Sequence, residues 1–377
     1  MIRFKLLPSV ILAVALLSCS NWIIENPENG NSSDSTIVNT DTVVVDDTII
    51  INPDDTTEII VSTSDTVVIT FSGSSATVSA PESLSKYLTA SVTGADITLV
   101  QSESAGENTS GEIVYLVTGS STDGSLLLSG SYKCTVILRS LSLASSASAA
   151  VNIQNGKRIK LCIEGDNTLS DSSNGQQKAC MVIKGHPELT GSGTLTLTGN
   201  TKHALKCNEY MQLKKSFSGS IIVKSAVGDG LHIGQYLEMN NGTITVNNVG
   251  DDGVQIEKTD DTEDEQNGFA LINGGTINAT ITAAAAKGLK SDSIMTITGG
   301  TFNITTTGGG VTGTNDTTSA CACIKAGSDL TISGGTFTLK STGSGGKGIS
   351  CDGDMTISDG NLSITTTGTR YSASIIK

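Results

Sequence analysis

Aromatic side chains, proline and positive charge are all scarce in this sequence. Only 3% of its 377 residues are aromatic, it contains 5 Pro, and its 23 Lys and Arg are outnumbered by 37 Asp and Glu. The shortage of rings excludes a core built on large aromatic side chains. The formal net charge of -14 argues against a nucleic-acid partner, because phosphate binding requires a positive surface. Cations and neutral polymers suit this composition better.

Glycine and small or β-branched residues are abundant instead. The chain has 42 Gly, many of them in pairs, and the pairs separate short runs of Ser, Thr, Asn, Val and Ile. Such runs are typical of many short strands with few or no long helices. The sequence therefore predicts an all-β protein.

The first 19 residues have the order of a bacterial export signal. Arg3 and Lys5 precede an apolar stretch too short for a comfortable transmembrane helix, and the stretch ends in Leu17-Ser18-Cys19. This order predicts a signal peptide. Its Leu-x-Ser-Cys ending resembles a bacterial lipobox, which implies lipidation of Cys19 and attachment to a membrane, with simple secretion as the alternative. We therefore expect an exported lipoprotein on the outer membrane or the cell surface.

A change of composition follows the signal. Residues 20–63 are rich in Ser, Thr, Asp and Asn and lack the Gly-pair rhythm of the remainder. This composition predicts a tether, with some strand content as an alternative, leading to a domain that spans residues 64–377.

Two patterns recur along that domain. The first is written as YLEMNNGTITV (236–246), FALINGGTINA (269–279), IMTITGGTFNI (294–304), DLTISGGTFTL (329–339) and DMTISDGNLSI (354–364), with a weaker copy from Glu188. The second precedes the first and is an apolar residue followed by a polar one, as in Ile183-Lys184, Leu205-Lys206, Leu231-His232, Val254-Gln255, Leu289-Lys290, Ile324-Lys325 and Ile349-Ser350. The spacing indicates a unit of about 24 residues with two longer insertions.

A unit this short cannot bury its own apolar face, but stacked units can bury a continuous core. We therefore predict a parallel β-helix, a solenoid in which each unit is one turn. Strand alternation points Leu205 and Cys207 inward and Lys206 outward. It also predicts that Phe302 and Phe337 stack in the core; the alternative, a platform for stacking sugars, requires rings that face outward.

Several segments from about Ser64 onward carry a family resemblance. VVITFSGSSATVSAP, STDGSLLLSGSYKCTVILRSLSL and the LTISGGTFTL units are similar to the calcium-binding carbohydrate-binding β-helix family related to the family 9 polysaccharide (pectate) lyases. The resemblance implies a right-handed parallel β-helix. It also implies binding of Ca²⁺ and of plant-type polysaccharide, including acidic pectin-like polymer, without cleavage as a family trait.

Acidic residues recur at equivalent points of successive units. Asp229 and Asp252 each form an Asp-Gly corner, and stacked parallel strands lie about 4.8 Å apart, so the two carboxylates repel each other unless a cation lies between them. Calcium takes roughly six to eight oxygen ligands, including carboxylates. The candidate calcium ligands are Asp229, Asp251, Asp252, Glu257 and Asp292. Solvated turn residues are the alternative.

Outward polar residues form a predicted column made of Lys184, Lys206, His232, Gln255, Lys290 and Lys325. Stacked ammonium groups need counter-anions, which are either neighbouring Asp side chains or uronate carboxylates of a bound polymer. The candidate polysaccharide ligands are Lys206, His232, Lys290 and Lys325.

Seven cysteines remain besides Cys19, and an odd number in an exported protein argues against complete disulfide pairing. Cys207 and Cys351 take inward positions of the repeat and are predicted to be small core residues. Cys321 and Cys323 lack a second Cys or His pair at zinc spacing, so we interpret them as structural thiols or a disulfide rather than a metal site.

These observations favour a non-catalytic polysaccharide-binding lipoprotein that uses calcium and takes plant-type or acidic glycans. A calcium-dependent polysaccharide lyase with Lys206 or Lys290 as base is one alternative. A structural or adhesin β-helix is the other. At the end of the chain, Ile376-Lys377 aligns with Ile349-Ser350, which predicts the start of a further repeat.

Overall fold

The structure is a computed structural model that describes residues 66–103, 105, 112–260, 266–312 and 319–368, with the backbone alone of 48–49, 59–62, 318 and 373–376. The chain divides into two units, Met1–Thr42 and Val43–Lys377. The predicted signal peptide and Cys19 lie outside the described residues. None of the helices in the described residues has the length and apolarity needed to cross a membrane.

Within the described residues, one sheet contains 20 strands and is called the first sheet. Its strands are β1 (Thr48–Ile49), β2 (Ile59–Ser62), β3 (Val67–Ser72), β4 (Ser75–Pro81), β7 (Ile113–Ser121), β9 (Cys134–Ala144), β11 (Arg158–Glu164), β12 (Asp166–Ser170), β14 (His186–Gly191), β15 (Thr194–Gly199), β17 (Met211–Phe217), β18 (Ser220–Ala226), β20 (Tyr236–Met239), β21 (Thr243–Asn247), β23 (Phe269–Ile272), β24 (Thr276–Ile281), β26 (Met295–Ile297), β27 (Thr301–Thr306), β31 (Leu330–Ser341) and β33 (Met355–Thr366).

The second sheet has 12 strands in the described part of the chain. They are β5 (Leu88–Thr93), β6 (Asp96–Gln101), β8 (Ser125–Gly130), β10 (Val151–Asn155), β13 (Ala179–Ile183), β16 (His203–Cys207), β19 (Leu231–Gly234), β22 (Val254–Glu257), β25 (Lys287–Ser291), β30 (Ala322–Ala326), β32 (Lys347–Cys351) and β34 (Ala373–Ile376). The remaining elements are the hairpin of β28 (Val311–Thr312) and β29 (Thr318–Ser319), and the short helix α1 (Glu82–Ser85).

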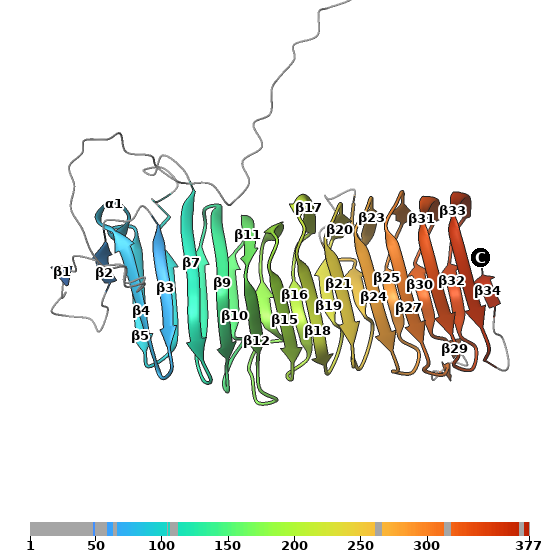
Figure 1. The fold of residues 1–377 in the computed structure, drawn as a ribbon, viewed down its shortest axis with the longest axis horizontal. Coiled ribbons are helices and arrows are strands. Elements are labelled where there is room, and N and C mark those ends of the chain that lie inside the picture. Colours follow the sequence, from blue (N-terminus) through green and yellow to red (C-terminus); the bar gives the residue numbers. More distant parts are fainter. Residues whose placement is uncertain are drawn as a thin grey trace, which may run out of the picture. The chain divides into compact units, whose positions relative to one another are not determined.

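Most neighbours in the two large sheets are parallel and come from successive repeats. In the second sheet, β19, β22 and β25 pair so that Leu231 lies opposite Val254, and Val254 opposite Leu289. Figure 1 shows the strands following one another in chain order, from β3 in blue to β33 in red. The prediction of an all-β chain with parallel strands in repeating units is confirmed.

The register also confirms the alignment of the first repeated pattern. Ile244, Ile277, Phe302, Phe337 and Leu362 hold the same place in successive copies, and each lies opposite the next. The shared position of these residues in the repeated pattern therefore corresponds to one column of stacked side chains in the core.

The glycine pairs have a conformational cause. The residue at the corner of each copy has a positive φ, with values of 86° at Gly242, 85° at Gly275, 100° at Gly300, 106° at Gly335 and 121° at Gly360. Glycine adopts this region without a steric penalty because it has no Cβ. The glycine rhythm thus marks the corner of each copy, which lies between two strands at Gly242, Gly275 and Gly300 and within β31 and β33 at Gly335 and Gly360.

Phe302 and Phe337 stack in the core as predicted. Their ring centroids lie 4.7 Å apart with an interplanar angle of 2°, and the residues are 0% and 1% exposed. This burial rules out the alternative of a sugar platform formed by these two rings.

None of the seven cysteines in the described residues forms a disulfide, and all seven are buried. Cys207 and Cys351 occupy inward positions, as predicted. Cys321 and Cys323 are structural thiols, and the alternative of a disulfide between them is wrong. The Cys207 thiol contacts the backbone oxygens of Gly185 and Glu209 at 3.3 and 3.1 Å.

Two predicted registers are wrong. Val182 rather than Lys184 lies opposite Lys206, so Lys184 falls outside the outward column. Met181 and Ile183 are both apolar and both point inward. Placing either residue opposite Leu205 therefore fits the repeated pattern equally well, and the structure has Met181 there. At the end of the chain, Ile349 pairs with Ile375 rather than Ile376, because adjacent isoleucines fit the pattern equally well. Lys377 lies outside the described residues.

The segment predicted as a tether contains strand in its described part. The backbone of β1 pairs antiparallel with β2, and β2 pairs in parallel with β4. Whether the domain begins at residue 64 therefore stays a prediction.

We expect Phe302→Ala to lower the free energy of unfolding by about 3 to 5 kcal/mol, because it removes a buried ring and leaves a cavity. Thr338→Ala, at an exposed position of β31 next to Phe337, should change it by less than about 0.5 kcal/mol. Guanidinium unfolding followed by circular dichroism compares the two variants. Equal effects of both substitutions would contradict a core role for the aromatic stack.

Candidate functional site

The outward face of the second sheet carries a continuous column of polar side chains. Parallel pairing places its members opposite one another in the order Lys206, His232, Gln255, Lys290, Lys325 and Ser350. The predicted column is therefore confirmed from Lys206 onward. Inward neighbours such as Leu205 and Leu231 are buried, so alternation along each short strand forces these polar groups outward.

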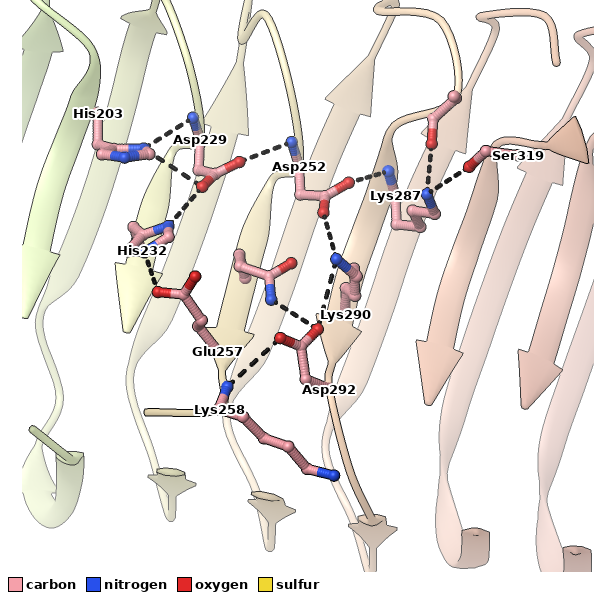
Figure 2. A network of polar contacts seen from close by, with 12 residues as sticks. His203, Asp229, His232, Asp252, Glu257, Lys258, Lys287, Lys290, Asp292 and Ser319 are labelled. Carbon is pink, nitrogen blue, oxygen red and sulfur yellow. Dashed lines mark hydrogen bonds and ion pairs between the residues drawn. The ribbon is translucent and has the colours of Figure 1, made fainter. Parts of the chain in front are cut away.

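A second set of side chains, here called the corner column, lies three residues before the outward column on each repeat. Its members are His203, Asp229, Asp252 and Lys287. Each of the first three accepts the backbone N–H of the next. Asp229 N donates to His203 Nδ1 at 3.1 Å, Asp252 N to Asp229 Oδ1 at 3.0 Å, and Lys287 N to Asp252 Oδ1 at 2.7 Å (Figure 2). These bonds satisfy backbone donors at the corners.

Asp229 is 4% exposed and lies between two histidines. Its Oδ2 is 2.7 Å from His232 Nδ1 and 3.2 Å from His203 Nδ1. Burial alone would raise the pKa of Asp229, but the interactions with His203 and His232 outweigh it and hold the pKa well below its usual range. Asp229 therefore carries its negative charge in a buried position. Burial lowers the pKa of His203 in turn.

Asp252 holds the same repeat position as Asp229 but has different partners. Its Oδ2 lies 3.5 Å from Lys290 Nζ. Burial raises the pKa of Asp252 to about 6, against the opposing attraction of Lys290 and Lys287. Asp251 is exposed beside it, and ligand oxygens of Asp229, Asp251 and Asp252 lie within 4.8 Å of one another. The structure thus brings together the first predicted set of carboxylates.

Glu257 and Asp292 follow the paired residues Ile256 and Ser291, so they share a repeat position as predicted. Each carboxylate has its own partners. Glu257 Oε2 is 2.8 Å from His232 Nε2, whereas Asp292 Oδ1 is 3.4 Å from Lys290 Nζ. In the described residues, neither belongs to a cluster of ligand atoms close enough to hold an ion. Their role as calcium ligands stays a prediction.

The lysines of the outward column differ in their surroundings. Lys290 lies between Asp252 and Asp292, which raise its pKa although burial alone would lower it. Lys325 pairs with Asp352. Neighbouring Asp side chains are thus the counter-ions of these two lysines, which is one of the two alternatives drawn from the sequence.

Lys206 is in a different environment. Burial lowers its pKa, Lys178 and Lys202 add to the effect, and Glu257 opposes it. None of the ion pairs among the described residues includes Lys206. It lines a pocket of about 370 Å³ with Asn208, Gly234, Glu257, Lys258, Thr259 and Asp260.

Sequence reasoning missed two features. His203 belongs to the corner column, and extending the alignment of the repeats to three residues before Lys206 and His232 would have placed it opposite Asp229. A surface stack of rings runs along the first sheet, with centroid distances of 4.3 Å from His186 to Tyr210 and 4.5 Å from Tyr210 to Tyr236. Tyr210 and Tyr236 stand at equivalent positions just before Met211 and Leu237, which are paired.

A search of curated proteins gives no match to this chain. Among solved structures, the chain is similar to the polysaccharide lyase-like protein from C. thermocellum, determined as a gadolinium derivative. The two are 18% identical with a TM-score of 0.53, and the match covers 79% of this chain and 100% of the other. At this identity the likeness concerns the fold.

A protein family also matches this sequence. Residues 105–369 fit the family described as carbohydrate-binding domain-containing protein. This stretch contains the outward column, the corner column and the pocket at Lys206. The chain belongs to the family of carbohydrate-binding domain-containing proteins.

Proposed function

We propose that the chain is a non-catalytic polysaccharide-binding protein and that the outward face of the second sheet holds the polymer. The carrying observation is the polar surface around Lys206 and its pocket, in a chain that belongs to a carbohydrate-binding family. Successive repeats place Lys206, His232 and Gln255 opposite one another, so a linear polymer lying along the column meets polar groups at a regular interval.

Acidic, pectin-like or other plant-type glycans are the substrates that we propose. Lys206 offers an ammonium group outside the ion pairs described above, and a uronate carboxylate is a matching partner. Gln255 Oε1 is buried and has no hydrogen-bond partner among the described residues. A buried acceptor of this kind is costly to leave unsatisfied, and a sugar hydroxyl is a suitable donor.

We further propose that calcium assists this binding at Asp229, Asp251 and Asp252. The three carboxylates fit a hard cation, and the exposed Asp251 gives solvent access. Three side chains fall short of the roughly six to eight oxygens that calcium takes. Carboxylates of the polymer and water can supply the rest, which makes the ion a bridge. The proposal does not extend to Glu257 and Asp292, whose partners are given above.

Two finer points of the fold and location belong to the same proposal. The parallel repeats, together with the likeness to the polysaccharide lyase-like protein, support a right-handed parallel β-helix. The order of residues around Cys19 supports export, lipidation and a location on the outer membrane or the cell surface, from which a polymer can be captured.

Binding to polygalacturonate should weaken with added sodium chloride more than binding to a neutral glucan, because salt screens charge attraction. Lys206→Ala should weaken polygalacturonate binding severalfold. Lys215→Ala, the same charge change at an exposed position of β17 in the first sheet, should not. Affinity electrophoresis measures both effects. Equal salt sensitivity for the two polymers would contradict a uronate site, and no binding to any polysaccharide would favour a structural or adhesin role.

Calcium should raise the unfolding temperature of the chelator-treated protein, because a ligand bound to the native state stabilises it. Asp251→Asn should reduce that increase, and Asp252→Ala should remove most of it. Asp166→Asn, at an exposed position of β12, is the matched control and should leave the increase unchanged. Differential scanning fluorimetry measures these shifts. Identical melting curves with calcium and with chelator would refute the calcium proposal.

A lyase is the second candidate function, and one observation favours it. Lys206 has a lowered pKa and lines a pocket with Glu257, and a lysine base with a lowered pKa suits proton abstraction next to a uronate carboxylate. Under this alternative, polygalacturonate with calcium gives an unsaturated product whose ultraviolet absorbance rises with time, and Lys206→Ala abolishes the rise. Under the binding function that we prefer, absorbance stays constant for both proteins.

A further inference from the structure

Two histidines and a carboxylate converge where β16 and β19 begin. His203 Nδ1 and His232 Nδ1 lie 3.2 and 2.7 Å from the same oxygen, Oδ2 of Asp229 (Figure 2). The ligand atoms of the three residues all lie within 4.8 Å of one another. The side chains of His203, Asp229 and His232 are 3%, 6% and 12% exposed, so solvent reaches the cluster from the His232 side.

The proton count at this cluster is unusual. Asp229 N–H donates to His203 Nδ1, so that nitrogen carries a lone pair rather than a proton. Both ring nitrogens of His232 face carboxylate oxygens, Asp229 Oδ2 at 2.7 Å and Glu257 Oε2 at 2.8 Å. A neutral imidazole has one N–H, and an ionised carboxylate has none. One of the two His232 contacts therefore needs either a second proton on the His232 ring or a cation between the ring nitrogen and the carboxylate oxygen.

Glu257 resembles the outer-shell partner of a metal-bound histidine. Histidine ligands usually donate their other ring N–H to a carboxylate, which fixes the tautomer and the ring orientation. The contact from His232 Nε2 to Glu257 has this arrangement and leaves Nδ1 as the atom that faces Asp229. The His203 and His232 rings also stack, with centroids 4.3 Å apart and an angle of 28°, which restrains both rings.

We propose that His203 Nδ1, His232 Nδ1 and Asp229 Oδ2 form a binding site for a divalent transition-metal cation, with Zn²⁺ as the representative ion. Zinc binds imidazole nitrogen and carboxylate oxygen at about 2.0 to 2.2 Å, which places tetrahedral ligands roughly 3.3 Å apart. The separation at His203 already matches, and that at His232 must widen by a few tenths of an ångström. The ion takes over the His203 lone pair that now accepts Asp229 N–H.

This site differs from the proposed calcium site in donor atoms, although both use Asp229. Imidazole nitrogen suits zinc and its neighbours in the first transition row, whereas calcium prefers oxygen alone. Three protein ligands leave a fourth position open for water or a sugar hydroxyl. The site joins the start of β16 to β19 and, through Glu257, to the end of β22, and it does not depend on the polysaccharide proposal.

The test uses tag-free, chelator-treated full-length protein titrated with Zn²⁺ in a calorimeter and with Co²⁺ in a visible spectrometer. We expect one Zn²⁺ per chain and the strong visible bands of tetrahedral Co²⁺. Glu257→Gln should weaken zinc binding by about 10- to 100-fold, as is typical for an outer-shell partner. His232→Gln should weaken it further, because it removes a ligand.

Matched controls separate the metal site from its surroundings. His186→Gln removes the described histidine that lies outside the cluster, and Asp166→Asn removes an exposed carboxylate of β12; both should bind Zn²⁺ like the wild type. If His232→Gln does not fold by circular dichroism, Glu257→Gln decides alone. The proposal is overturned if Glu257→Gln binds as tightly as the wild type, if Co²⁺ gives the weak spectrum of octahedral coordination, or if a sulfur-to-cobalt band assigns the ion to cysteines.

Discussion

Parallel pairing between equivalent residues of successive repeats is the constraint on which the rest of the structure depends. It places like residues on top of one another, so each position of the repeat becomes a column through the protein. Apolar columns gain from this arrangement, as the stacked rings of Phe302 and Phe337 show. The glycine positions of the first repeated pattern require a backbone with positive φ, which glycine tolerates, as at Gly300 and Gly335. Charged columns are the costly case, because like charges repel at this spacing.

The corner column shows how the protein reduces that cost. Asp229 and Asp252 are stacked carboxylates, yet each uses one oxygen to accept the backbone N–H of the following repeat. The other oxygen of Asp229 faces two histidines, and that of Asp252 faces Lys290. The same residue type at the same position therefore has a lowered pKa in one repeat and a raised pKa in the next. Burial and neighbouring side chains, rather than repeat position alone, set the pKa of each carboxyl group.

These partners bear on both proposed cation sites. Calcium at Asp251 and Asp252 has to compete with the Lys290 ammonium, which favours a bridging role in which an acidic polymer adds oxygens and negative charge. On the other side of Asp229, imidazole nitrogens replace oxygens as donors, and the preferred ion changes with them. Lys206 lines a pocket with Glu257 and lies opposite His232, and its ammonium group suits a uronate carboxylate. We thus propose three chemically distinct contacts on one face of the second sheet.

The sequence by itself determined the all-β class, the repeat, the inward and outward faces and the equivalence of Asp229 with Asp252, because alternation along a strand and the repeat period are written in residue order. It could not decide between alignments where two apolar residues fit, which is why Lys184 was misplaced. Only the tertiary structure decided that Lys290 pairs with Asp252 and that His203 joins Asp229 and His232. Such contacts run between turns, and their distances depend on side-chain directions and corner geometry that no spacing along the chain specifies.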